Sequence, residues 1–435
     1  IVTFNSIGTT NALGIYLGLA LVVLIALIYN KFFVSRIAKI AAGIFAVALF
    51  ISILLINYWP IFIGLILIML ILLTSNRFVS KWLPLLVIII SSFILLIAFD
   101  FIKIKLPVFN LPAEVTPSFQ ASWHVAKNTI QEGVKNFILG SGPATFGYQY
   151  SLYRDSSLNG TSFWDLRFAQ GYNAVLTHLV SWGFLGTILF LATLICSLVL
   201  ILRLRLKRHA NSLLGLAIES GVVYLVLLLF FYPQNYVLYF SLFLFLGFLI
   251  AKVSIVNNEH ESLSLAGSPR KTFVFSLIIM ILVMLATTVL YLNSQRYLGA
   301  IYFAQGIRIA NESGNIDEAL PYLLSGLDLD PKNDSYLQTL SSAFLIKANN
   351  DLNKASSLSK DLQAQFSGNI GSALQMARRS TEVNPSNSAN WLILAKTYES
   401  VITLVSGAAE ESFKAYEQAV KLEPNNPAIF AGLGR

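Results

Sequence analysis

Long apolar blocks alternate with short polar connections through the first two thirds of the chain. A helix rises about 1.5 Å per residue, so a block of roughly 18 to 30 apolar residues can cross a hydrocarbon core about 30 Å thick. We expect transmembrane helices over residues 11–29, 37–57, 59–74, 83–99, 172–202, 213–232, 236–256 and 273–292. The pattern therefore predicts an all-α protein with a bundle of about eight transmembrane helices.

The composition also favours a membrane protein. Hydrophobic residues make up 56% of the 435 residues and charged residues only 12%, a balance more apolar than that of soluble globular chains. The single cysteine, Cys196, lies inside the fifth predicted span and has no disulfide partner in the chain. The chain begins without methionine and stops at Arg435 within a predicted helical unit, so we expect it to be part of a longer protein.

Lysine and arginine are concentrated in alternate connections between the predicted spans. They follow the first, third, fifth and seventh spans, as Lys31, Arg36, Lys39, Arg77, Lys81, Arg203, Arg205, Lys207, Arg208, Lys252, Arg270 and Lys271. Short loops rich in Lys and Arg are retained in the cytoplasm, so residues 100–171 and everything after residue 292 are predicted to lie outside the cytoplasmic membrane. The net charge of +8 is thus largely a topology signal, and no basic cluster on one soluble face indicates a nucleic-acid partner.

These patterns divide the chain into four segments. Residues 1–99 hold the first four predicted spans, 100–171 form an extracytoplasmic loop, 172–292 hold the other four spans, and 293–435 form a polar domain with helical periodicity. In the polar domain a small residue stands twelve positions before a Pro-x-Asn sequence three times: Ala319 before Pro331, Ala373 before Pro385, and Ser412 before Pro424. This spacing resembles the tetratricopeptide repeat, with insertions or a degenerate unit between copies. We expect such a domain to bind a protein partner or guide an acceptor.

Several motifs occur in the predicted loop and in the span that follows it. They are Ser122-Trp123-His124, Ile138-Leu139-Gly140-Ser141-Gly142-Pro143, Tyr153-Arg154, Phe163-Trp164-Asp165-Leu166-Arg167, Tyr172-Asn173 and Gly183-Phe184-Leu185-Gly186. Together they resemble the O-antigen ligase and polymerase family, whose large loop carries a similar Trp, an hGxGPxxF turn, and a following helix with Asn and Gly-x-x-Gly. The resemblance covers most of residues 1–255. It implies transfer of a saccharide from a polyprenyl-pyrophosphate donor to a glycan, lipid or protein acceptor on the outer side of the cytoplasmic membrane.

The chain departs from the family pattern where a general base is expected. Family ligases often have His before the helix Asn, where this chain has Tyr172, and an acidic residue two positions before the first helix glycine, where it has Ser181. His178 lies on a helix face about 120° from Tyr172, so it cannot simply replace that imidazole. An arginine common before the loop tryptophan is also absent, because Gln120-Ala121-Ser122 stands there.

The implied chemistry needs a cation beside the leaving pyrophosphate. Arginine suits this, because its planar fork can donate two hydrogen bonds to phosphate oxygens and stays protonated. We expect Arg167 to contact the donor, with Arg154 second, because the aromatic residues just before Arg167 favour the headgroup level. The catalytic candidates are Arg167, Arg154, Tyr172 and His178, and the substrate-binding candidates are Asn173, Gly140, Gly142, Trp164 and His124. We expect no metal or other cofactor.

Structural roles compete with each of these assignments. His124 could be solvent-exposed on an amphipathic helix, and His178 could hydrogen-bond a neighbouring helix. The glycines could serve a tight turn or a nest of amides for phosphate, and Glu219, the one carboxylate inside a predicted span, could be functional or paired with a basic residue. Other candidate bases are Asp155 and Asp165, and weaker cations are Lys127 and Lys135. The alternatives to transfer are a non-catalytic membrane scaffold and a transporter of lipid-linked glycans.

Overall fold

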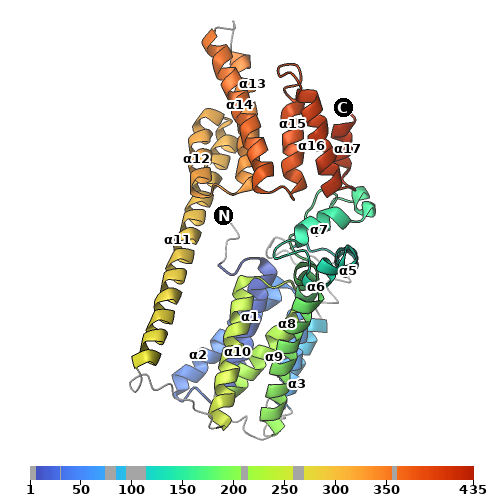
Figure 1. Cartoon of the computed structure of the whole chain (residues 1–435). Helices are drawn as coiled ribbons and strands as arrows, with labels where there is room; N and C mark the ends of the chain where they lie inside the picture. The colour runs from blue at the N-terminus through green and yellow to red at the C-terminus, as the bar shows by residue number, and fades with distance from the viewer. Residues whose placement is uncertain are drawn as a thin grey trace. The chain divides into compact units, whose positions relative to one another are not determined.

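The computed structural model describes residues 6–29, 31–73, 85–94, 114–206, 214–257, 269–354 and 360–435. Across these ranges the regular elements are helices, without a strand, which confirms the all-α prediction for the described part of the chain (Figure 1). The basic residues Arg77, Lys81, Lys207 and Arg208 and the ends of the third, fourth and sixth predicted spans lie outside the described ranges. The chain divides into two compact units, unit 1 with Ile1–Tyr150 and Phe168–Glu261, and unit 2 with Ser151–Arg167 and Ser262–Arg435.

Unit 1 holds most of the apolar helices and part of the predicted loop. Its apolar helices are α1 (Thr10–Tyr29), α2 (Arg36–Ile56), α3 (Trp59–Leu73), a short helix over Leu85–Ile94, α8 (Ala174–Leu206), α9 (Gly215–Leu228) and α10 (Tyr236–Asn257). The loop contributes α5 (Phe119–Gln131), α6 (Val134–Leu139) and most of α7 (Phe146–Tyr153). Residues 100–171 are therefore helical over much of their described part.

Five described helices are long and apolar enough to cross a membrane. They are Thr10–Ile28, Arg36–Ile56, Ala174–Leu206, Tyr236–Val256 and Pro269–Ser313. Three shorter apolar helices, Trp59–Leu72, Leu85–Ile94 and Gly215–Leu228, fall within the third, fourth and sixth predicted spans. These helices mark the chain as a membrane-associated protein.

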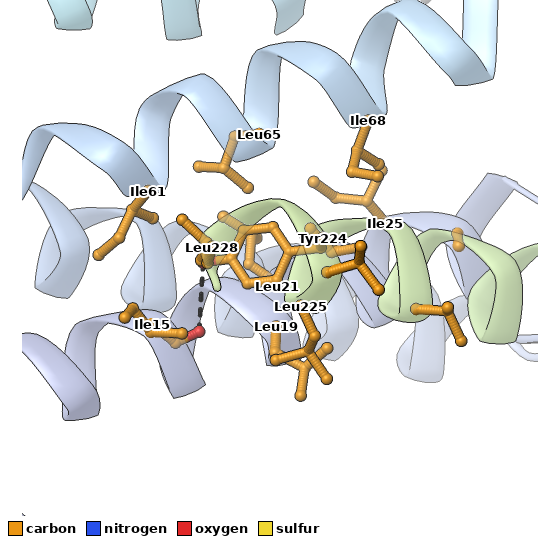
Figure 2. Close-up of a cluster of buried hydrophobic side chains, with 14 of the residues drawn as sticks. Ile15, Leu19, Leu21, Ile25, Ile61, Leu65, Ile68, Tyr224, Leu225 and Leu228 are labelled. Carbon is orange, nitrogen blue, oxygen red and sulfur yellow. Dashed lines mark hydrogen bonds between the residues drawn. The ribbon is translucent and has the colours of Figure 1, made fainter. Parts of the chain in front are cut away.

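The core of unit 1 is built around one tyrosine. Tyr224 on α9 is fully buried, and its hydroxyl donates to the carbonyl of Ile15 on α1 at 3.2 Å (Figure 2). A Cβ at Gly18 would lie 2.0 Å from the Tyr224 hydroxyl oxygen, and one at Gly64 would lie 2.7 Å from its ring. Glycine at these two positions lets α1 and α3 close around the ring, as small residues commonly do between membrane helices.

Opposite ends of unit 1 collect different side chains. At one end the hydroxyl of Tyr58, between α2 and α3, donates to the carbonyl of Phe231 after α9, and Thr9 lies against Tyr232. At the other end Arg205 near the end of α8 reaches the carbonyl of Ile71 near the end of α3. The turn between α2 and α3 and the residues after α9 thus meet at one end of the bundle, and the basic end of α8 lies at the other.

Unit 2 begins with one long helix that continues from the last apolar block into the polar domain. α11 spans Pro269–Ser313, so the predicted boundary at residue 293 falls inside a helix. The remaining elements are η1 (Ser156–Gly160), α12 (Ile316–Leu329), α13 (Asp334–Lys354), α14 (Lys360–Val383), α15 (Ser388–Glu399), α16 (Ala408–Leu422) and α17 (Pro427–Leu433). Consecutive helices pack together, α11 on α12, α13 on α14 and α15 on α16.

The three Pro-x-Asn sequences start helices in unit 2. Asn387 and Asn426 cap α15 and α17, each accepting a hydrogen bond from the amide two residues on, and Asn333 accepts from the amide of Tyr336 in α13. Asparagine is among the strongest N-cap residues because its side chain satisfies an otherwise unpaired amide. The small residues that precede them, Ala319, Ala373 and Ser412, are buried in α12, α14 and α16. The repeated sequence therefore corresponds to a repeated pair of helices.

Candidate functional site

The start of α8 is held by the side chain of Asn173. Its Oδ1 accepts from the amide of Leu176 at 2.9 Å, and its Nδ2 donates to the carbonyl of Phe230 at 2.9 Å. The amide of Ala174 donates to the carbonyl of Leu229, so the first turn of α8 is tied to the end of α9. Asn173 is buried, and both polar ends of its side chain are engaged in this N-cap.

Tyr172 connects the same helix start to the loop helix α5. Its amide donates to the hydroxyl oxygen of Ser122 at 2.8 Å, and its ring stands edge-on to Phe119, with the centroids 5.9 Å apart. Ser122 is fully buried and donates in turn to the carbonyl of Ser118. Two motifs that are separate in the sequence, Ser-Trp-His and Tyr-Asn, therefore meet in unit 1.

The two glycines of the loop turn pack on a break in α8. Gly183 has φ of 64° and ψ of −167°, which interrupts the helix and frees the carbonyls of Val180 and Ser181. The amides of Ser141 and Gly142 donate to those two carbonyls at 2.9 and 3.0 Å. A Cβ on Gly140 would lie 2.5 Å from the Gly183 nitrogen, too close for any other residue.

This arrangement favours the tight-turn interpretation of the glycines. The amide of Gly140 donates to the carbonyl of Asn136, so the three consecutive amides from Gly140 to Gly142 all have protein acceptors. A nest that binds phosphate needs amides that point at the ligand. The turn therefore serves to fasten the loop to α8.

The two histidine candidates occupy different environments. His178 is buried, stacks on Trp182 with ring centroids 3.8 Å apart, and shares a 2.7 Å hydrogen bond with the hydroxyl of Tyr239 on α10. His124 is exposed on α5, where its ring lies 3.1 Å from the side-chain nitrogen of Asn128. His178 thus hydrogen-bonds a neighbouring helix and His124 is exposed to solvent, which are the structural roles that the sequence left open for them.

The two candidate arginines belong to unit 2, where both pair with one glutamate. Arg167 contacts Glu423 Oε2 at 2.6 Å, and Arg154 lies 3.5 Å from Glu423 Oε1. The hydroxyl of Ser388 donates to the same carboxylate at 2.7 Å. The side chains of Arg154 and Glu423 are 1% exposed, whereas that of Arg167 is 35% exposed.

Further hydrogen bonds attach the segment Ser151–Arg167 to the turn before α17. The side-chain nitrogen of Asn425 donates to the carbonyl of Arg154 at 2.8 Å, and that of Asn159 donates to the carbonyl of Asn425 at 2.9 Å. Arg154 also donates to Asn159. Trp164 in the same segment is exposed. Arg154 therefore has the contacts of a structural residue, while Arg167 keeps a solvent-facing part.

The predicted site residues are thus distributed over both units. Unit 1 contains Tyr172, Asn173, His178, Gly140, Gly142 and His124, and unit 2 contains Arg154, Arg167 and Trp164. Tyr172 and Asn173 are brought together with the loop helix, and the two arginines are brought together on Glu423. The partner of the arginines was not foreseen, because Glu423 lies 256 residues from Arg167 in the sequence.

A carboxylate that the sequence analysis missed lies at the end of unit 1 that carries Tyr172. Glu114, just before α5, accepts from the hydroxyl of Tyr232 at 2.8 Å, and Thr9 lies 2.6 Å from the same hydroxyl. Burial raises the pKa of Tyr58 above its ordinary value, and Tyr232, Tyr172 and Glu114 raise it further. The signal in the sequence was one isolated charge within the apolar stretch 106–118.

Glu219 inside α9 is paired, as one of its two interpretations anticipated. Its carboxylate contacts Arg205 Nε at 2.9 Å and the ammonium group of Lys252, and its side chain is fully buried. The two cations supply the counter-charges that a buried carboxylate needs. The geometry accounts for Glu219 without a substrate.

No protein-family model matches the chain, and no curated protein matches it. Within the described ranges, His, Cys, Asp and Glu side chains form no group of three or more that could hold a metal ion.

Proposed function

We propose that the protein transfers a saccharide from a polyprenyl-pyrophosphate donor to an acceptor at the outer face of the cytoplasmic membrane, in the manner of O-antigen ligases and polymerases. One observation carries the proposal: four of the six motifs behind that resemblance are bonded together in unit 1. The glycine turn packs on α8 at Gly183, and α5 is bonded to the start of the same helix at Tyr172. A loop held at both places is suited to keep donor and acceptor in a fixed geometry.

The proposal includes eight membrane spans and an extracytoplasmic location for the loop and the polar domain. In support, the five long and three shorter apolar helices overlap the predicted spans, and the basic end of α8 lies at the end of unit 1 opposite to Tyr58. Single cysteines at the exposed positions Ser162 and Lys332, in a Cys196→Ala background, are expected to react with an impermeant thiol reagent in intact cells. Lys31→Cys is the matched cytoplasmic control and is expected to react only after lysis. Reaction of Lys31→Cys in intact cells would contradict the orientation.

We propose that the helix pairs of unit 2 are tetratricopeptide-like repeats. Their support is the Asn cap that recurs two residues after each proline and the buried small residue twelve positions before that proline. Stacked helix pairs offer a concave surface for an extended partner, so this domain would bind a protein or guide the acceptor.

Within this function Arg167 is the residue that we assign to the donor pyrophosphate. One terminal nitrogen of Arg167 contacts Glu423. A guanidinium has five N–H donors, so Arg167 has further donors that can bind phosphate oxygens. Its exposed fraction also separates it from Arg154, which is enclosed. Glu423 would then hold the arginine in position.

Transfer rates of three variants test the assignment. Arg167→Ala is expected to lose nearly all transfer and Arg167→Lys much of it, because a lysine lacks the planar fork. Arg308→Ala, an exposed arginine of α11, is the control and should keep the wild-type rate. Membrane vesicles with a polyprenyl-pyrophosphate glycan and matched protein amounts would be used. Near-normal rates for both Arg167 variants would refute the role of this residue.

A scaffold that presents the repeat domain is the second candidate function. It is favoured by the enclosure of Arg154 and by the engagement of His178 with Tyr239 and Trp182. If the protein is a scaffold without transferase activity, substitutions of Arg154 or His178 should not change the rate of saccharide transfer. A transporter would use charged groups deep in its spans, and Glu219 is instead paired with two cations.

A further inference from the structure

The carboxylate of Glu114 has one oxygen engaged and one without a partner. Oε1 accepts from the hydroxyl of Tyr232, while Oε2 is buried and has no hydrogen bond. In the part of the chain that the structure describes, Glu114 forms no ion pair with a lysine or arginine. A buried acceptor without a donor is uncommon in proteins, and a hydroxyl group is a donor that would satisfy it.

Aromatic side chains lie beside this carboxylate. The hydroxyl of Tyr232 donates to Glu114, and the rings of Tyr232 and Tyr58 stand edge to face with centroids 5.9 Å apart. Trp59, which follows Tyr58, is 44% exposed. A carboxylate next to aromatic rings is a combination that can bind a sugar, because the rings cover its apolar face while the carboxylate accepts from its hydroxyls.

The elements that bring these groups together are the ones that the loop motifs also fix. Thr9 lies just before α1, Tyr58 in the turn between α2 and α3, and Tyr232 just after α9. Glu114 itself lies just before α5, the helix that is bonded to Tyr172 through Ser122. The carboxylate is therefore positioned by the bundle and by the loop together.

We propose that Glu114 is the general base of the transfer reaction and that its aromatic neighbours bind the acceptor saccharide. This inference rests on the proposed function. The acceptor oxygen forms a bond to the anomeric carbon of the donor, the bond from that carbon to the pyrophosphate oxygen breaks, and the pyrophosphate leaves with the electron pair. The hydroxyl proton of the acceptor passes to Glu114.

Substitution by the isosteric amide tests the base. Glu114→Gln keeps the shape and the hydrogen bond from Tyr232 but cannot accept a proton, so the turnover rate should fall by about 10² to 10⁴. Binding of the polyprenyl-pyrophosphate donor, measured separately with a labelled donor, should stay unchanged. Glu132→Gln, an exposed carboxylate of the same loop, is the matched control and should keep the wild-type turnover.

The pH profile separates a base from a residue that only supports the fold. The pH dependence of the wild-type rate should contain a limb that is absent in Glu114→Gln. Tyr232→Phe removes a hydrogen bond to the carboxylate, so that limb should shift in this variant. Tyr232→Phe keeps the aromatic ring, so the pH dependence of its transfer rate can be measured even if Glu114→Gln folds poorly.

The outcomes distinguish the inference from the function on which it rests. A wild type that transfers glycan, with Glu114→Gln within threefold of it, overturns the base and leaves the proposed function standing. An unshifted limb in Tyr232→Phe likewise overturns it. A well-inserted wild type that turns over no lipid-pyrophosphate donor overturns the proposed function and the inference with it.

Discussion

Each of the two units buries a glutamate between two cationic side chains, and the two arrangements are made differently. In unit 1, Glu219 of α9 contacts Arg205 of α8 and Lys252 of α10, which are 14 and 33 residues away in the sequence. In unit 2, Glu423 contacts Arg167, which lies 256 residues away. The first arrangement joins consecutive apolar helices, while the second joins a loop segment to the end of a polar helical domain.

The two arrangements should respond differently when their ion pairs are broken. Glu219 is enclosed within apolar helices, so its cations have little access to water, although Arg205 is 20% exposed. Glu423 holds a segment that also has a solvent-facing arginine, so this segment could separate from its partner and become hydrated. Breaking the first arrangement should therefore cost stability, and breaking the second should chiefly release the segment.

The largest effect is expected from Glu219→Leu. It leaves Lys252 and Arg205 without a counter-charge, and removal of one partner of a buried pair costs about 3–5 kcal/mol. Thermal unfolding in detergent should show a correspondingly lower midpoint. The double variant Glu219→Leu with Lys252→Met should recover most of the loss, because only the partly exposed arginine remains charged. A single variant within 1 kcal/mol of wild type would contradict the pairing.

Glu423→Ala should expose the segment Ser151–Arg167. Trypsin cleaves after arginine, and Arg154 is enclosed in the wild type, so cleavage at Arg154 should become at least tenfold faster in the variant. Glu417→Ala, an exposed position on the neighbouring helix α16, is the control and should leave the cleavage rate unchanged. Equal cleavage of wild type and Glu423→Ala would show that the ion pairs do not hold the segment.

The two arginines should differ from one another. Arg154→Met removes the enclosed cation and leaves Glu423 with Arg167, for an expected loss of about 1–3 kcal/mol, since Arg154 also donates to Asn159. The stability of unit 2 against urea would measure it. Arg154→Lys should recover part of the loss, because the charge returns without the second donor.

The smallest effect is expected from Arg167→Met, because a partly exposed ion pair is worth only about 0–1 kcal/mol. Raising the salt concentration should weaken the wild-type contact and leave the Glu219 pairing almost unchanged, since screening acts on exposed charges. Urea unfolding at low and high salt would compare the two. A loss larger than that of Arg154→Met would reverse the assignment of structural and exposed roles.

Local patterns in the sequence predicted much of the fold. The apolar blocks correspond to apolar helices, because the length of an apolar stretch can be read from consecutive residues. Each Pro-x-Asn sequence leads into a helix, because an N-cap bonds only to amides two or three residues on. The departure at Tyr172 drew attention to a missing base. The candidate site was predictable only in part, since the sequence motifs indicate Arg167 and Asn173 but not the residues that hold them, Glu423 and Phe230.

What the sequence determined by itself is therefore the helical class, the apolar helices and the recurring helix starts, all of which follow from contacts within a few turns. Only the tertiary structure decided that Glu423 meets two arginines of the loop, that Gly140 packs on Gly183, and that Glu114 stands against Tyr232. Such contacts join positions far apart in the chain. Their partners are selected by packing and by the satisfaction of buried polar groups, which no local pattern of residues encodes.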